Sequence, residues 1–86
     1  MKVDFRKVKT LGLDGTEQEW DISKELGNTI YQKTADLGEL ELARDIYRNG
    51  EVDLTPEQVE VVRRYVREGF KAFVQEGVER ILSVKY

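Results

Sequence analysis

Apolar and polar residues alternate along residues 2–13, and this alternation predicts an extended strand with one buried face. The apolar residues that share one parity are Val3, Phe5, Leu11 and Leu13. Val8 has the opposite parity, which favours a β-bulge near this residue.

The dipeptide of Asp14 and Gly15 predicts a tight turn at the end of this strand. An Asp-Gly pair is typical of a two-residue type I′ turn, in which both central residues have positive φ. Such a turn pairs Leu13 with Thr16. In this register, one face of the hairpin holds Leu11, Leu13, Trp20 and Ile22. Because an isolated hairpin is only marginally stable, we expect other elements to cover this face.

A first short helix is predicted from Ser23, its expected N-cap, to about Thr34. Leu26 and Ile30 are four residues apart and are expected to face inward. Gly27 lies in the helix interior and weakens the helix by about 1 kcal/mol relative to alanine.

A second short helix is predicted after Asp36, which with Glu39 resembles a capping box in which Asp replaces Ser or Thr. The apolar stripe of this helix is Leu40, Ala43, Ile46 and Tyr47. Asn49 and Gly50 predict its C-terminal end, because glycine readily adopts the left-handed conformation that ends many helices.

Residues 54–59 contain the clearest helix start in the chain. Thr55 is the predicted N-cap, and Pro56 occupies the first helical position. Gln58 completes the capping box. Leu54 and Val59 stand at the two positions of a hydrophobic staple.

The helix that begins here is predicted to run to about Leu82, because no further proline interrupts the chain. Its main apolar stripe is Val59, Val62, Val66, Phe70, Phe73, Gly77 and Ile81, and a second stripe beside it is Val74, Val78 and Leu82. Such a helix is about 40 Å long, whereas a globule of this size is roughly 30 Å across. Either the helix bends near Gly69 or Gly77, or its end protrudes and needs a partner.

Together these elements predict an α+β fold, in which an N-terminal β-hairpin packs against two short helices and one long C-terminal helix. The chain of 86 residues is enough for a single domain, residues 1–86, with the hairpin in 1–22 and the helical part in 23–86.

The second apolar stripe predicts self-association through an interface of Val74, Val78 and Leu82. Exposed apolar patches of several hundred Å² typically mark contact sites, and two-fold pairing is the commonest symmetry of small oligomers. The alternative is that the hairpin covers these residues within one chain.

Composition favours a cytoplasmic protein without a membrane or nucleic-acid partner. Charged residues make up 36% of the chain and the net charge is −3, which disfavours binding to phosphates. The chain has no cysteine, its N-terminal residues show no signal peptide, and no apolar run approaches the roughly 18 residues of a membrane span.

The residue inventory predicts no enzyme. Histidine and cysteine are both absent, which removes the commonest general base, metal ligand and thiol nucleophile. Residues 45–56 superficially resemble a calcium-binding loop, but Tyr47 stands at the third position and Pro56 stands where a bidentate glutamate is required. We therefore expect no catalytic residues, no metal site and no cofactor.

Four basic residues, Arg63, Arg64, Arg67 and Lys71, lie within about 100° of one another around the predicted long helix. Glutamates three or four residues away favour ion pairs on a solvated helix face. Two other interpretations stay open: the basic stripe binds an acidic protein partner, or it contacts nucleic acid.

Three segments of the chain, residues 23–31, 36–43 and 50–55, resemble small uncharacterised proteins of bacterial prophages and other mobile elements. Some of those proteins are similar to tail-assembly or accessory factors. The resemblance implies a bacterial cytoplasmic location and a role in protein assembly, and it assigns no functional residues.

The predicted function is therefore a non-enzymatic protein-interaction or assembly module that binds itself or another protein. The alternative is a small regulatory protein that contacts nucleic acid through the basic stripe. A salt titration separates the two, because electrostatic binding to nucleic acid weakens steeply as salt rises.

Overall fold

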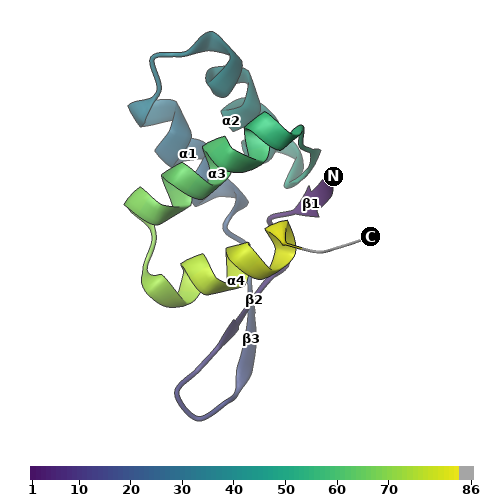
Figure 1. The fold of residues 1–86 in the computed structure, drawn as a ribbon, viewed down its shortest axis with the longest axis vertical. Helices are drawn as coiled ribbons and strands as arrows, with labels where there is room; N and C mark the ends of the chain where they lie inside the picture. The colour runs from purple at the N-terminus through teal and green to yellow at the C-terminus, as the bar shows by residue number, and fades with distance from the viewer. Residues whose placement is uncertain (84–86) are drawn as a thin grey trace.

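The structure is a computed structural model that describes residues 1–83. Residues 84–86 of the predicted domain lie outside the described residues. The described part of the chain is α+β, with two small antiparallel sheets and helices packed around them (Figure 1). The elements in chain order are β1 (Lys2–Asp4), β2 (Val8–Leu11), β3 (Glu17–Trp20), α1 (Ser23–Lys33), α2 (Leu37–Asn49), β4 (Glu51–Asp53), α3 (Pro56–Gly69) and α4 (Ala72–Leu82).

The first sheet joins β1 to β4, a strand that the sequence analysis did not predict. Val3 pairs with Val52, and the backbone N–H of Phe5 donates to the carbonyl of Gly50 over 2.9 Å. Gly50 has a φ of +73°, so it ends α2 as predicted and also turns the chain toward β1. The two valines are buried and close one side of the core.

The second sheet is the β2–β3 hairpin, but its register differs by one residue from the predicted one. Leu11 pairs with Glu17, and the N–H of Gly12 donates to the carbonyl of Thr16 over 2.8 Å, so the loop has three residues instead of two. The N–H of Gly15 donates to the carbonyl of Gly12 over 3.0 Å, and Gly15 has a φ of +82°. This is a type I turn followed by a left-handed residue, the usual three-residue hairpin loop, so the predicted type I′ turn is wrong.

A one-residue change of register exchanges the two faces of a hairpin. The predicted inner residues Leu11 and Leu13 are therefore exposed, while Val8 and Thr10 are buried. The chain turns at residues 5–7 instead of forming a bulge near Val8. Val8 thus begins a separate strand with its own inner face.

The predicted N-cap of α1 is wrong, whereas its predicted inner face is confirmed. Ser23 is the first helical residue, and the carboxylate of Asp21 accepts from its N–H (3.0 Å) and its hydroxyl (2.6 Å). Leu26 and Ile30 are fully buried. The helix ends at Lys33, close to the predicted boundary.

The N-cap of α2 is confirmed, because Asp36 accepts from the N–H of Glu39 over 2.9 Å. The buried face of α2 is rotated by part of a turn from the predicted apolar stripe. Ala43 and Ile46 are buried as predicted, and so is Leu42, whereas Tyr47 is 48% exposed. Leu40 is half-buried.

The predicted N-terminal box of α3 is confirmed in full. The hydroxyl of Thr55 accepts from the N–H of Gln58 over 3.2 Å, and the side chain of Gln58 accepts from the N–H of Thr55 over 2.9 Å. Pro56 occupies the first helical position. Leu54 and Val59, the predicted staple residues, are both buried.

The predicted single long helix is wrong, because the chain leaves helical geometry after Gly69 and begins α4 at Ala72 (Figure 1). The break lies near one of the two glycines where a bend was expected. The side-chain amide of Gln75 donates to the carbonyl of Phe70 over 2.8 Å and so satisfies a free carbonyl at the break.

The break allows α4 to fold back against β2 and α3. Gly77 touches the strand, and a Cβ at this position would lie 2.5 Å from the carbonyl oxygen of Lys9. This close approach buries Val78 and Leu82 in the core of the chain. No helix within residues 1–83 combines the length and the apolar character that a membrane crossing requires.

Candidate functional site

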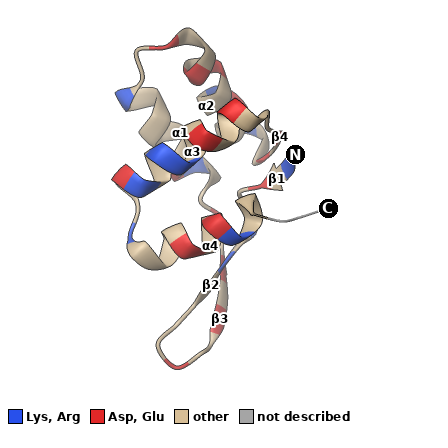
Figure 2. Ribbon diagram, viewed as in Figure 1, with Lys and Arg blue, Asp and Glu red and all other residues tan. Residues whose placement is uncertain are grey.

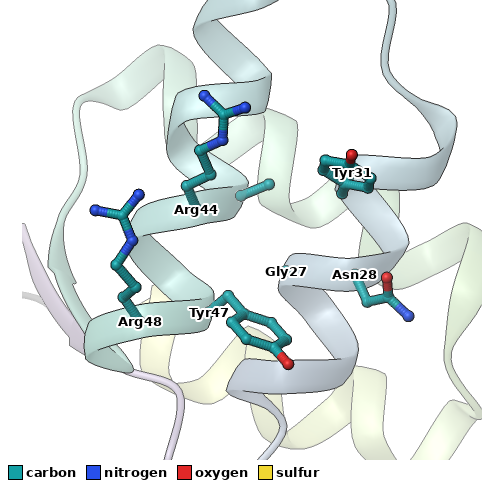
Figure 3. A pocket seen from close by; sticks show the side chains of 7 residues that line it. Gly27, Asn28, Tyr31, Arg44, Tyr47 and Arg48 are labelled. Carbon is teal, nitrogen blue, oxygen red and sulfur yellow. The ribbon is translucent and has the colours of Figure 1, made fainter.

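A groove of about 270 Å³ lies on the surface between α1 and α2. Its lining residues are Gly27, Asn28, Tyr31, Ala43, Arg44, Tyr47 and Arg48. Positions three and four residues apart lie on one side of a helix, so both helices direct one stripe toward the groove (Figure 3).

Gly27 forms the floor of the groove and sets the spacing of the two helices. A Cβ at this position would lie 2.9 Å from the carbonyl oxygen of Ala43 and 2.9 Å from the Cβ of Tyr47. The absent side chain therefore lets α1 and α2 approach closely. This contact explains why a helix interior contains a residue that lowers helix propensity.

Two tyrosines border the groove. Tyr31 is 57% exposed and Tyr47 is 48% exposed. In Figure 3 the ring of Tyr47 reaches from α2 toward α1, and Tyr31 lies on the opposite helix. The ammonium of Lys24 lies 4.2 Å from the ring centroid of Tyr47 and also donates to the Tyr47 carbonyl over 3.2 Å, so this ring is held in place from one side.

The groove has a positive lining on a chain of net charge −3. Arg44 and Arg48 are its charged residues, they extend in the same direction from α2 in Figure 3, and no carboxylate is among the lining residues. Arg44 pairs with Glu41 over 2.7 Å. Within residues 1–83, Arg48 has no carboxylate in ion-pair contact. Its guanidinium is therefore available to a carboxylate from outside the chain.

In the structure, the four residues of the predicted basic stripe do not form one continuous basic surface. Arg63 pairs with Glu60 and with Glu79, both over 2.6 Å, and these hydrogen bonds raise its pKa. Arg64 pairs with Glu39 over 3.0 Å. Figure 2 shows acidic and basic residues side by side along α3. Arg67 and Lys71 are exposed and make no ion pair with any residue from 1 to 83.

The pairing of Arg64 belongs to a polar cluster that joins α2 to α3. The carboxylate of Glu39 accepts from the hydroxyls of Tyr65 (2.7 Å) and Thr34 (2.8 Å) and from Arg64. These hydrogen bonds, that of Tyr65 above all, lower the pKa of Glu39. Because all three donors are used to hold one carboxylate, the cluster has a structural role.

The predicted oligomer interface lies mostly inside the chain. Val78 is 1% exposed and Leu82 is 4% exposed, and Val74 is half-buried against the same core. The expectation that these residues form an exposed patch is therefore wrong, because the break after Gly69 folds α4 against β2 and α3. As in the alternative, they are covered within one chain, but by α3 as well as by the hairpin.

A second apolar surface lies on the projecting hairpin. A groove of about 430 Å³ is lined by Thr10, Leu11, Gly12, Leu13, Asp14, Thr16, Gln18, Trp20 and Phe73. The rings of Trp20 and Phe73 lie 6.2 Å apart, and the Trp20 indole N–H donates to Thr10 over 2.7 Å. Trp20 and Phe73 are each more than 40% exposed, and Leu13 at the tip is fully exposed.

Comparisons of the chain with protein-family models, with curated proteins and with solved structures find no match. Within residues 1–83, no three acidic side chains are gathered as a metal site would require. The function is therefore inferred from the α1–α2 groove and the hairpin surface. Both combine exposed aromatic or aliphatic side chains with nearby charge, which is the composition of protein contact sites.

Sequence reasoning missed the α1–α2 groove, although signals for it were present. The apolar spacing predicts Tyr47 on the core stripe of its helix and gives no role to Tyr31. Gly27 is the signal that pointed to the site, because a glycine inside a helix often marks a close approach of two backbones. The arginines one position after Ala43 and Tyr47 lie on the edge of the same stripe.

Proposed function

We propose that this protein is a non-enzymatic protein-interaction module that binds an acidic segment of a partner protein in the α1–α2 groove. The observation that carries the proposal is that two arginines and two exposed tyrosines line one groove, on a chain of net charge −3. Tyrosine and arginine are enriched among the residues that dominate binding energy at protein interfaces.

The chemistry of the groove favours a carboxylate-bearing peptide over nucleic acid. Arginine forms bidentate pairs with carboxylates, and the tyrosines offer apolar area with little loss of side-chain entropy. Nucleic-acid affinity, in contrast, depends on neutralising many phosphates. The groove offers Arg44, Arg48 and the adjacent Lys24, and the basic stripe on α3 is half used in internal ion pairs.

The resemblance of the chain to prophage-type accessory proteins adds an assembly role in the bacterial cytoplasm to this proposal. A small module that holds an acidic segment is suited to link larger components during assembly. The partner is defined by its chemistry, an acidic segment that also offers an apolar side chain to the tyrosines.

The test is a titration of the isotope-labelled protein with the blocked peptide Glu-Leu-Glu-Glu-Leu-Glu, followed by amide and side-chain chemical shifts. We expect shifts at Gly27, Tyr31 and Tyr47. The peptide Lys-Leu-Lys-Lys-Leu-Lys and a single-stranded oligothymidine serve as probes of opposite and of phosphate charge, and neither is expected to shift these signals.

Two variants with the same charge reversal locate the site. Arg48→Glu is expected to weaken peptide binding by about tenfold, the loss of one charge-assisted contact. Arg67→Glu changes an exposed arginine outside the groove and should leave binding unchanged. Equal loss in both variants, or stronger binding of the oligothymidine than of the acidic peptide, contradicts the proposal.

A further inference from the structure

We propose that the segment bound in the α1–α2 groove is the tip of the β2–β3 hairpin of a second copy of this chain, so that copies associate head to tail. This inference rests on the proposed function, because it names the occupant of the same groove. The residues of the incoming tip are Leu13, which enters the groove, and Asp14 and Glu17, which face Arg44 and Arg48.

The first observation is where exposed apolar side chains lie. The large hydrophobic residues that are exposed among residues 1–83 are Leu11, Leu13, Trp20, Tyr31, Leu37, Tyr47 and Phe73. Tyr31 and Tyr47 border the α1–α2 groove, and all the others except Leu37 line the hairpin surface. The exposed apolar area is thus concentrated in two surfaces, which is the arrangement expected of two complementary contact sites.

The second observation is that the two surfaces have opposite charge. The hairpin from residue 8 to residue 20 contains three acidic residues, Asp14, Glu17 and Glu19, and one basic residue, Lys9, whose ammonium lies 3.8 Å from the carboxylate of Glu17. Its net charge is therefore negative. Figure 2 shows this acidic character on β3 and at the tip. The groove contains two arginines and no carboxylate. Complementary charge of this kind directs association and fixes the orientation of the partners.

The third observation is shape. Leu13 stands at the end of a hairpin that projects from the body of the protein, and its side chain is fully exposed (Figure 1). The groove, at about 270 Å³, is smaller than the pockets of about 300–1,000 Å³ that hold drug-sized ligands. A groove of this size suits one protruding aliphatic side chain and its neighbours.

Placement in the molecule makes the contact intermolecular. The hairpin projects at one end of the longest axis, which measures 41 Å, and α1 and α2 lie toward the other end (Figure 1). A hairpin therefore cannot reach the groove of its own chain. A contact between two different surfaces is heterologous, and it repeats into a row or closes into a ring.

Symmetric pairing of hairpins is the competing arrangement, and the sequence of β3 disfavours it. Antiparallel pairing of two β3 strands about Gln18 places Glu17 of one copy opposite Glu19 of the other. Like charges directly opposite one another destabilise a strand pair. The acidic edge thus protects β3 from pairing with itself and leaves the tip free to meet the basic groove.

The experiment is a complementation test with two variants that each lose one surface. Leu13→Ser removes the apolar side chain at the hairpin tip, and Arg48→Glu reverses the charge in the groove. Both residues are exposed, so circular dichroism should show an unchanged fold. Sedimentation velocity over a range of concentrations should show association of the natural chain, weakened by about tenfold or more in each variant.

Mixing the two variants decides the geometry. The Arg48→Glu chain keeps an intact hairpin and the Leu13→Ser chain keeps an intact groove, so a mixture should form a 1:1 dimer that grows no further. As a second test, the double variant Glu17→Lys with Arg48→Glu should recover association, because the charge pair is restored in reverse. Arg67→Glu should associate like the natural chain.

A natural chain that stays monomeric at all concentrations, association that Leu13→Ser does not weaken, or a mixture that forms no dimer each overturns the head-to-tail arrangement. These failures leave the proposed function intact if the acidic peptide still binds the groove and depends on Arg48. If the peptide does not bind either, both proposals fall.

Discussion

Replacing Gly27 with alanine tests the central packing contact of the groove, because its two effects on stability have opposite signs. In an unobstructed helix, alanine is more favourable than glycine by about 1 kcal/mol. Here the added Cβ would lie 2.9 Å from the carbonyl oxygen of Ala43 and from the Cβ of Tyr47, and 3.2 Å from the Tyr47 nitrogen. Two of these three atoms belong to the backbone, so α1 and α2 must separate.

Separating two packed elements to admit one methyl group typically costs about 1–3 kcal/mol. After subtraction of the gain in helix propensity, we expect Gly27→Ala to lower the free energy of unfolding by about 1 kcal/mol, within a range of roughly 0–2 kcal/mol. For a domain of this size, that corresponds to a fall of about 4–8 °C in the melting temperature.

The assay is urea denaturation followed by circular dichroism, with Gly38→Ala as the matched control. Gly38 lies in the exposed first turn of α2, where an added Cβ meets only the end of the Asp36 side chain at 3.1 Å. We expect the control to keep or raise the stability, by up to about 1 kcal/mol, because it gains helix propensity without moving a helix. A Gly27→Ala variant that is more stable than the natural chain refutes the close contact of α1 and α2.

Three further predictions follow from buried or hydrogen-bonded groups. Val78→Glu should abolish cooperative unfolding, measured by circular dichroism, because it places an unpaired charge in the core; a folded variant contradicts the burial of α4. Thr55→Ala should lower the denaturation midpoint by an amount equivalent to about 0.5–2 kcal/mol, and an unchanged midpoint contradicts the capping box. The pKa of Glu39 is lowered in the folded chain, first by the hydrogen bond from Tyr65, from an ordinary value of 4.5. Its stabilising contribution is therefore complete above about pH 4.5 and is lost as pH falls through the lower folded pKa. Denaturation midpoints measured from about pH 6 to about pH 3 should decline less steeply for Glu39→Gln than for the natural chain. Parallel declines contradict the role of the cluster.

The start of α2, the end of α2 and the start of α3 could be predicted from sequence because their signals are local. Asp36, Gly50 and Thr55 each act on backbone groups within a few residues, so a short stretch of sequence contains the whole interaction. The buried faces of α1 and α3 follow for the same reason, since the spacing of apolar residues is itself a local property.

The remaining features depend on contacts between distant segments. The Asp-Gly dipeptide fits a two-residue or a three-residue loop, and the burial of Val8 beneath α4 decides between them. The break after Gly69 likewise brings Gly77 against the carbonyl of Lys9. The α1–α2 groove was missed because the depth at which Tyr47 packs depends on how closely Gly27 lets the helices approach.

Pairing of β1 with β4 has a consequence for the order in which the chain folds. Val3 and Val52 are hydrogen-bonded neighbours in the sheet although 49 residues separate them, whereas Val8 and Trp20 in the hairpin are 12 residues apart. Closing the longer loop costs about 1 kcal/mol more chain entropy. The hairpin and the α1–α2 pair can therefore form early, on the timescale of microseconds for a hairpin. The β1–β4 sheet then joins the N-terminal strand to the middle of an already compact chain.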